Sequence, residues 1–470
     1  MKHVLILFTD QQRYDTIGAY GNPLIQTPNL DRLVADSIVF ERCITPSPVC
    51  VPARLSLMSG QYPARTGNNN NNKKKKYEGE GLYAKLTGAG YNSCNVGKMH
   101  YVWDTYGPIG FGRRHTQEEM SHFDDDYTNF ILNSPYRNVF DYNGQRSEMY
   151  YVPQVSQLPA EAHPTQWVGD RSVEFLKSCD PRKPVFLFSS FIHPHPPFSP
   201  PAPWNKLYRS EDIPAPFMPE NIEEFRPLQN KKYGTERLGI SATDAKKLKN
   251  FYYACVSFVD YQIGRIINTL KERGMYDDTL IIFTSDHGEC LGDYNSMGKR
   301  TMLDAAAHIP MIMHVPGRRQ ETRRDVCSLV DVAPTILSWA GIDYDPAEYD
   351  GVDLLRGRHD YVYSQYNGRE NGGVYMIAGA FEKLIYDSAG DKYYYFDSFP
   401  ETKNKYDEND PHIAGLRGLL MKYYESDVGE SPKPEARKHP SDFGVEWMDH
   451  TARHDEEAAR IPEGYRIDLR

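Results

Sequence analysis

The segment Ser47-Pro-Val-Cys-Val-Pro-Ala-Arg-Leu-Ser-Leu-Met-Ser-Gly60 places a cysteine at the beginning of a predicted helix. Pro48 and Pro52 flank Cys50 and favour extended or turn geometry, and Pro52 also suits the first turn of a helix. A lone cysteine is most often a small buried hydrophobe. Here, however, the helix N-terminus favours an anion, and Arg54 adds a positive charge one turn later. This setting suits a nucleophile that faces an oxyanion.

A buried strand is predicted near the start of the chain, and polar residues follow it directly. Val4–Phe8 is a short, continuous apolar run, which is typical of a parallel strand covered on both faces. Thr9, Asp10 and Gln11 follow this run, and Asp10 and Gln11 carry the stronger ligand groups. Asp10 could cap a turn, but open α/β sheets bind ligands beyond the carboxyl ends of their strands. Both residues are therefore candidates for a ligand-binding site.

Further apolar runs predict strands that also end in polar motifs. The predicted strands are residues 37–42, 91–96, 184–191, 279–284 and 309–315. Lys98 and His100 follow the second of these strands and would offer an ammonium and an imidazole to an oxyanion. Asp286 and His287 follow the fourth strand, and this pair suits a divalent metal ion together with the carboxylate of Asp10.

These motifs together resemble the sulfatase family. The pattern Cys-x-Pro-x-Arg at Cys50, followed by Leu-x-x-x-Ser-Gly-x-Tyr-Pro and Arg-x-Gly, is similar to the signature of that family, with Ala53 where many members carry serine. Gly-Lys-x-His ending at His100 and Phe-x-x-Pro-His-x-Pro around His195 resemble two further hallmarks. The resemblance spans most of the first 400 residues.

The resemblance implies a modified nucleophile and a metal site. Cys50 would be oxidised after translation to Cα-formylglycine by a maturation enzyme, and the hydrated aldehyde would be the nucleophile. One divalent cation would be held by four residues, with Ca²⁺ expected first and Mn²⁺ or Mg²⁺ as alternatives. These ligands would be Asp10, Gln11, Asp286 and His287.

The resemblance also implies roles for five further residues. Arg54 would orient the hydrated aldehyde, and Lys98 and Lys299 would neutralise the sulfuryl oxygens. His195 would protonate the departing oxygen, and His100 would take the proton that allows sulfate to leave. Beside the family lysine, Arg300 replaces a histidine that is often found there. His193 is an additional, weaker candidate.

The expected activity is hydrolysis of an aryl or carbohydrate sulfate ester, either a small molecule or an oligosaccharide. The nearest alternative is a phosphodiester or phosphonate monoester hydrolase on the same fold, although the Gly-Lys-x-His motif favours sulfate. Another alternative is an inactive relative that binds sulfated ligands, which would follow if Cys50 remained a thiol.

The expected fold is an alkaline-phosphatase-like α/β domain over residues 1–355, with a large, mostly parallel sheet flanked by helices. Residues 356–470 should form a smaller α+β subdomain, because short alternating segments separated by turn residues predict an antiparallel sheet. Helices are predicted at residues 27–33, 81–90, 244–274, 331–337 and 412–425. The longest carries an apolar stripe that includes Cys255, and Thr243 is its predicted N-cap.

Composition excludes several classes of protein. The net charge of −10 and pI of about 5.9 give no overall field that would attract nucleic acid or an anionic membrane. Seven cysteines without paired spacing favour reduced thiols, and the first apolar run is too short for a signal peptide. A cytoplasmic protein is therefore expected.

Three segments carry little pattern. Residues 68–76 (five Asn, then four Lys) predict a solvated loop, to which we assign no function. Residues 101–165 predict irregular structure, with some aromatic side chains at a pocket mouth. The charged, Pro-rich tail from about residue 430 could wrap the domain or serve as an arm in a homo-oligomer.

Overall fold

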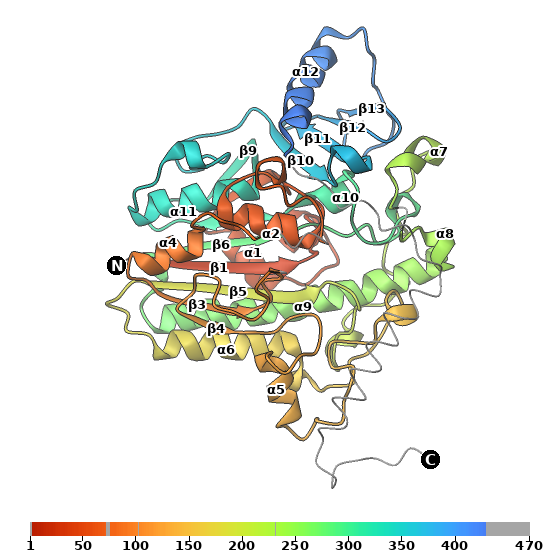
Figure 1. Cartoon of the computed structure of the whole chain (residues 1–470). Helices are drawn as coiled ribbons and strands as arrows, with labels where there is room; N and C mark the ends of the chain where they lie inside the picture. Colours follow the sequence, from red (N-terminus) through yellow and green to blue (C-terminus); the bar gives the residue numbers. More distant parts are fainter. Residues whose placement is uncertain (1, 72–75, 102, 231, 429–470) are drawn as a thin grey trace.

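The computed structural model describes residues 2–71, 76–101, 103–230 and 232–428. Its centre is a nine-stranded sheet with the order β4-β3-β5-β1-β6-β8-β2-β7, in which β9 also pairs with β2 (Figure 1). The strands are β1 (His3–Asp10), β2 (Ile38–Ile44), β3 (Asn92–Gly97), β4 (Arg113–His115), β5 (Val185–Pro194), β6 (Thr279–Ser285), β7 (His308–Ile309), β8 (Met311–His314) and β9 (Glu321–Ser328).

Most neighbouring strands run parallel, which confirms the expected fold class. β1 pairs in parallel with both β5 and β6, and β3 pairs in parallel with β4 and β5. β8 is antiparallel to β6 and to β2. The single strand predicted at 309–315 is divided into β7 and β8 at Pro310, because proline cannot donate a ladder hydrogen bond. The sequence analysis did not predict β9.

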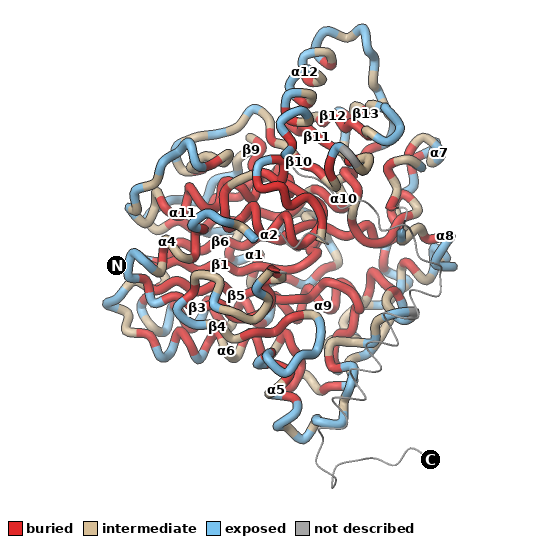
Figure 2. Tube along the Cα trace, viewed as in Figure 1, coloured by how far each residue is buried: buried red, intermediate tan, exposed pale blue. Residues whose placement is uncertain are grey.

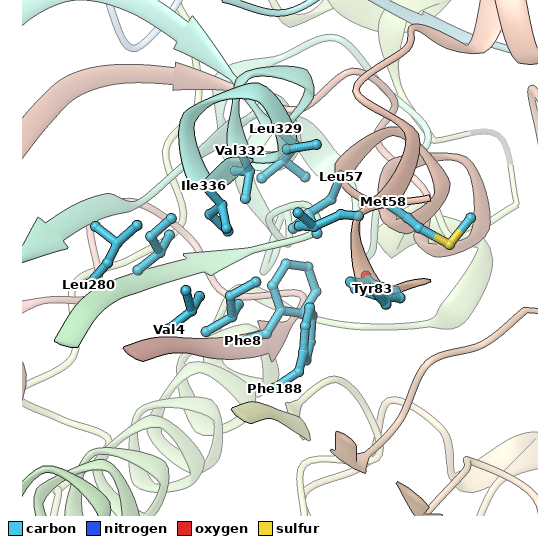
Figure 3. Packing of buried hydrophobic residues seen from close by; sticks show 14 of the residues in the cluster. Val4, Phe8, Leu57, Met58, Tyr83, Phe188, Leu280, Leu329, Val332 and Ile336 are labelled. Atoms are coloured by element: carbon cyan, nitrogen blue, oxygen red, sulfur yellow. The ribbon is translucent and has the colours of Figure 1, made fainter. Parts of the chain in front are cut away.

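Alternate residues of β1 face two separate cores. Val4, Ile6 and Phe8 pack with α2 (Cys50–Ser59), α4 (Leu82–Gly88) and α11 (Val332–Ala340), and Figure 3 shows part of this cluster. Leu5 and Leu7 pack with α1 (Pro28–Val34), α6 (Pro164–Ser178) and α9 (Ala242–Glu272). The centre of the sheet is therefore buried on both sides, as the red strands in Figure 2 show, and its strands β1, β5 and β6 are mostly apolar for this reason.

The longest helix, α9, begins two residues earlier than predicted. Its N-cap is Ser241, whose hydroxyl accepts a hydrogen bond from the backbone N–H of Asp244 in a capping box. The prediction of Thr243 as the N-cap was therefore wrong, because only Ser241 has a carboxylate at the third helical position to complete the box. Cys255 lies in the buried stripe, as expected.

The C-terminal part contains the expected antiparallel sheet. Its order is β10-β11-β12-β13, and α12 packs against β11 and β12 (Figure 1). These elements are β10 (Val362–Tyr366), β11 (Val374–Ala378), β12 (Lys383–Asp387), β13 (Lys392–Phe396) and α12 (Pro411–Ser426). The domain boundary between residues 355 and 356 stays a prediction, and the tail from residue 430 lies outside the described residues.

Two expectations about the whole chain are addressed directly by the structure. All seven cysteines are buried and free, as expected for reduced thiols. Within the described ranges, no helix combines the length and the apolar character that crossing a bilayer requires. The cytoplasmic location stays a prediction.

A buried ionic cluster joins the C-terminal sheet to the main sheet. The Lys383 ammonium, on β12, is fully buried and donates to the Met302 carbonyl (2.7 Å), to Asp304 Oδ1 (2.6 Å) and to Glu401. Asp304 also pairs with Arg42 of β2. Lys383 therefore anchors the loop that follows Lys299 and Arg300.

Replacing Lys383 with methionine is expected to destabilise the protein by about 3–5 kcal/mol, because the change leaves buried Glu401 and the largely buried Asp304 with one cation fewer. Urea unfolding of the purified variant measures this loss. The control is Lys405→Met, which breaks a half-exposed pair with Asp397 and should cost less than about 1 kcal/mol. A Lys383→Met loss as small as the control would contradict the anchoring role.

Candidate active site

Four strand ends meet at one edge of the main sheet. The four neighbouring strands are β3, β5, β1 and β6. Lys98, His195 and Asp286 directly follow β3, β5 and β6, and Asp10 is the last residue of β1. Because the four strands are parallel, their carboxyl ends lie at the same edge. Cys50 reaches this edge as the first residue of α2. The structure thus brings together residues that are up to 276 positions apart, namely Asp10 and Asp286.

Asp10, Cys50, Asp286 and His287 form a buried cluster that could hold a metal ion, since one ligand atom of each lies within 4.8 Å of the others. His287 Nε2 lies 3.5 Å from Asp286 Oδ1 and 3.8 Å from Asp10 Oδ1. The other imidazole nitrogen, Nδ1, contacts the Gly288 carbonyl at 3.0 Å. That contact assigns the proton to Nδ1 and leaves the Nε2 lone pair facing the two carboxylates.

The outer oxygens of both carboxylates are held by cations. Arg54 Nε donates to Asp286 Oδ2 at 3.0 Å, and Arg54 Nη2 donates to Asp10 Oδ2 at 3.1 Å. Lys98 Nζ also donates to Asp10 Oδ2. The Oδ1 atoms are left facing the centre of the cluster. Such outer contacts orient metal ligands in proteins.

The charges and donors in this cluster fit a divalent cation. Burial and the neighbouring charge of Asp10 raise the pKa of Asp286, whereas Lys98, His195 and Lys299 outweigh burial and hold the pKa of Asp10 below its usual value. Gln11 is buried, and its backbone N–H donates to Asp286 Oδ1 at 2.9 Å. Its side-chain Oε1 is buried and has no hydrogen-bond partner among the described residues, whereas its Nε2 donates to Glu289. An amide oxygen without a partner is a donor type that a hard cation takes.

Cys50 lies among positively charged and imidazole groups. Its Sγ is 3.0 Å from Lys299 Nζ and 3.3 Å from His287 Nε2. Burial alone would raise the pKa of the Cys50 thiol, but Lys299, Lys98 and His287 outweigh burial and hold that pKa well below its usual value. This environment stabilises negative charge at residue 50, as the sequence analysis expected.

Both predicted site histidines face Glu119. His195 Nε2 lies 3.7 Å from Glu119 Oε1, and His100 Nδ1 lies 3.8 Å from the same oxygen. The second nitrogen of His195, Nδ1, contacts the Pro196 carbonyl at 2.7 Å, so Nε2 faces the pocket. His193 is not part of the site, because its Nδ1 contacts Thr165 Oγ1 at 3.0 Å.

Glu119 is a site residue that the sequence analysis missed. Besides the two histidines, its carboxylate pairs with Lys98 and with Arg146 (3.1 Å). Burial would raise the pKa of Glu119, but His195, Lys98 and Arg146 outweigh burial and keep it well below its usual value. The residue lies in the irregular segment 101–165, where no periodicity or motif distinguishes one carboxylate from the others.

The expectation of a solvated loop at residues 68–76 was wrong for its first part. Asn68, Asn69 and Asn70 are buried, and Asn71 lies beside the nucleophile. The Asn71 side-chain oxygen accepts a hydrogen bond from the backbone N–H of Val51 (3.0 Å), in the first turn of α2. The helix α2 has no capping side chain on its own N-cap residue, Val49. Asn71 therefore pairs with a first-turn N–H group that has no acceptor within the helix.

A cavity of about 140 Å³ opens onto Cys50. It is lined by Cys50, Asn71, His100, Glu119, Tyr150, Tyr151, His195, Tyr233, Lys299 and Arg300. Tyr150 and Tyr151 come from the irregular segment, as expected for some of its aromatics. Tyr101, from the same segment, is instead fully buried and donates to the Arg54 carbonyl.

Comparison with known proteins gives consistent matches. The sulfatase family model matches residues 2–342, which include every residue of the candidate site. An arylsulfatase from Clostridium perfringens is 28% identical over 459 residues, covering 90% of this chain and 94% of the relative. A choline-sulfatase from Rhizobium meliloti is 28% identical over 378 residues, covering 75% and 70%.

A solved structure also resembles the whole fold. The phosphonate monoester hydrolase from Silicibacter pomeroyi superposes with a TM-score of 0.76 at 25% sequence identity. The superposition covers 92% of this chain and 96% of that one. The main sheet and the C-terminal sheet therefore belong to one shared architecture.

Proposed function

The chain belongs to the sulfatase family of hydrolases, and on that premise we propose that it hydrolyses an aryl or carbohydrate sulfate ester with Cys50 converted to formylglycine. The observation that carries this proposal is the surroundings of Cys50. Lys299 contacts its sulfur, the buried Asp10–Asp286–His287 cluster adjoins it, and two histidines line the same cavity. A maturation enzyme would install the aldehyde.

In the first proposed step, one hydroxyl of the hydrated aldehyde at position 50 gives its proton to the Asp10 carboxylate, which lies beside residue 50, and its oxygen attacks the sulfur atom. The bond between sulfur and the leaving-group oxygen breaks as the new oxygen–sulfur bond forms. Lys98 and Lys299 would compensate the charge on the sulfuryl oxygens, since both ammonium groups already lie at this site. His195 Nε2 faces the cavity and would give its proton to the leaving oxygen.

In the second proposed step, sulfate leaves residue 50. His100 takes the proton from the remaining hydroxyl, the bond between carbon and the sulfate oxygen breaks, and the aldehyde forms again. Water then rehydrates the aldehyde, so the sum is one ester and one water converted to one alcohol and one hydrogen sulfate. Glu119 Oε1 lies 3.7 Å from His195 Nε2, and its charge would favour the protonated form of His195, against burial, which lowers the pKa of that imidazole.

A divalent cation held by Asp10, Gln11, Asp286 and His287 would supply Lewis-acid stabilisation of charge when bound. We propose Ca²⁺ first because three of these side chains offer oxygen. Mn²⁺ and Mg²⁺ are the alternatives, and the imidazole of His287 favours an ion that is less selective for oxygen than Ca²⁺ or Mg²⁺. Arg54 orients the carboxylates in either case, because its guanidinium spans Asp10 and Asp286.

A panel of substrates tests the proposed function. Aryl and sugar sulfates would be assayed beside aryl phosphates and phenyl phosphonates, with enzyme whose aldehyde content has been measured. We expect kcat/KM to be highest for a sulfate ester. The similarity to a phosphonate monoester hydrolase supports that activity as the second candidate, and a higher kcat/KM for phosphonates would select it. If no ester in the panel is hydrolysed, the result would favour an inactive protein that binds sulfated ligands.

The two histidines are expected to differ in their dependence on the leaving group. General acid catalysis is worth about 10²–10⁴-fold when the leaving oxygen is basic. His195→Ala should therefore cost little with an activated aryl sulfate and much with a sugar sulfate. His100→Ala should slow the release of sulfate, which is common to all substrates, so its penalty should be uniform.

Steady-state kinetics with a series of aryl and alkyl sulfates measures this difference. Mass spectrometry of rapidly quenched His100→Ala enzyme should detect sulfate attached to residue 50. A leaving-group dependence found for His100→Ala and not for His195→Ala would reverse the two roles.

A further inference from the structure

Arg300 is a cation of the active-site cavity whose charge the described protein does not compensate. Its Nη1 atom is buried and has no hydrogen-bond partner among the described residues. The other charged cavity residues do have carboxylate neighbours: Lys299 lies 4.0 Å from Asp10, and His100 and His195 both approach Glu119. No described carboxylate lies within ion-pairing distance of Arg300.

Tyrosine side chains surround the guanidinium instead. Arg300 Cζ lies 5.7 Å from the centroid of the Tyr233 ring, and Tyr150 and Tyr151 line the same cavity. The largest electrostatic interactions of the guanidinium are with these three phenols and with Tyr366. Phenols are neutral near pH 7, and those of Tyr150 and Tyr151 have pKa values raised by burial. They can position a cation, but they cannot neutralise it.

The backbone holds Arg300 in an unusual conformation. Its φ is +74°, which is uncommon for a residue with a side chain. Its N–H donates to the Pro48 carbonyl (3.1 Å), two residues before the nucleophile. A strained conformation of this kind persists where the surrounding structure imposes it, and such residues cluster at ligand sites.

These observations define a recognition group beside the reacting centre. Lys299 directs its ammonium toward Cys50, whereas the next residue lies against Tyr233 on the cavity wall. A partly buried guanidinium without an anion is unfavourable, and a planar fork binds carboxylate or sulfate oxygens in pairs. The missing anion would be supplied by whatever occupies the cavity.

We propose that Arg300 binds a second anionic group on the leaving-group side of the substrate. The preferred substrates would then be sulfate esters whose alcohol or phenol also carries a carboxylate or another sulfate. This inference rests on the proposed sulfatase activity and names the substrate class of that same site.

Three matched substrates test the inference: 3-carboxyphenyl sulfate, its methyl ester, and 1,3-phenylene disulfate. The measured quantity is the kcat/KM of each substrate with a second anionic group, divided by the kcat/KM of the methyl ester, whose second group is uncharged. This ratio cancels effects on the sulfate group that all three substrates share. Arg300→Gln is expected to lower this ratio by about 10- to 100-fold, the scale of one charge-assisted hydrogen-bonded contact. Arg300→Lys keeps the charge and loses the fork, so it should retain part of the ratio.

Arg209→Gln provides the matched control, because Arg209 is exposed and pairs with Glu211 on the surface. It should keep the wild-type ratio. A measurement on the wild-type enzyme avoids any folding defect of the variants: 3-hydroxybenzoate should inhibit at least about tenfold more strongly than its methyl ester.

The outcomes separate the inference from the function beneath it. A ratio that falls for the carboxylate only, or for the disulfate only, supports the inference and identifies the anion. An equal loss on all three substrates in Arg300→Gln, or equal inhibition by the two products, overturns it while leaving the sulfatase activity intact. If aldehyde-bearing wild-type enzyme hydrolysed none of these three and none of the aryl and sugar sulfates in the panel above, both proposals would be refuted.

Discussion

Replacing Cys50 with alanine is expected to reduce turnover of every substrate by roughly 10⁶-fold, the scale measured when a covalent nucleophile is removed from a hydrolase. The fold should persist, because α2 keeps the packing of its apolar side chains in the core. Steady-state kinetics beside thermal unfolding measures both quantities. The control Cys255→Ala removes another buried thiol, from α9, and should retain turnover.

Cys50→Ser separates the two steps of the proposed mechanism. A serine hydroxyl could accept the sulfuryl group, but its carbon carries no second hydroxyl that could expel sulfate. We therefore expect at most one turnover, with sulfate retained on residue 50. Sustained turnover by Cys50→Ala or Cys50→Ser would contradict the role of this residue.

Replacing Asp10 with alanine is expected to remove the bound metal and at least about 10³ of kcat/KM, since a Lewis-acid metal supplies several kcal/mol of transition-state stabilisation. The change also leaves Arg54 and Lys98 without a fully buried counterion. We expect an added loss of about 3–5 kcal/mol of stability. Elemental analysis of the dialysed variant gives the metal content independently of activity.

Asp15→Ala is the matched control for this experiment. Asp15 follows the same strand, but its side chain is 53% exposed and pairs with Arg13. This variant should keep one metal ion per chain. Full metal content in Asp10→Ala would exclude Asp10 from the metal site.

The sequence predicted the strand ends well because continuous apolar runs and polar motifs coincide there. Val4–Phe8 followed by Asp10 is the simplest case: a strand buried on both faces must be apolar throughout, and its first polar residues mark the sheet edge. The order of the strands could not be predicted in the same way. It places β3, β5, β1 and β6 side by side through pairings between distant segments.

Residues that act through long-range contacts were not predictable from local pattern. Glu119 is one of many carboxylates in an irregular segment, and only the fold brings it to Lys98 and Arg146. Asn71 belongs to a run of identical residues, which suggests exposure by composition, yet its amide completes the N-terminal turn of α2. In both cases the function of the residue depends on a contact formed only in the folded chain, which the local sequence does not indicate.

The state of residue 50 in active enzyme is the most direct test of the proposed mechanism. Trypsin should release the peptide from Cys43 to Arg54, which contains two cysteines in the encoded sequence. After alkylation, we predict one modified thiol, at Cys43, and an aldehyde or its hydrate at position 50 that reacts with a hydrazide. Two alkylated cysteines in fully active enzyme would contradict the formylglycine mechanism.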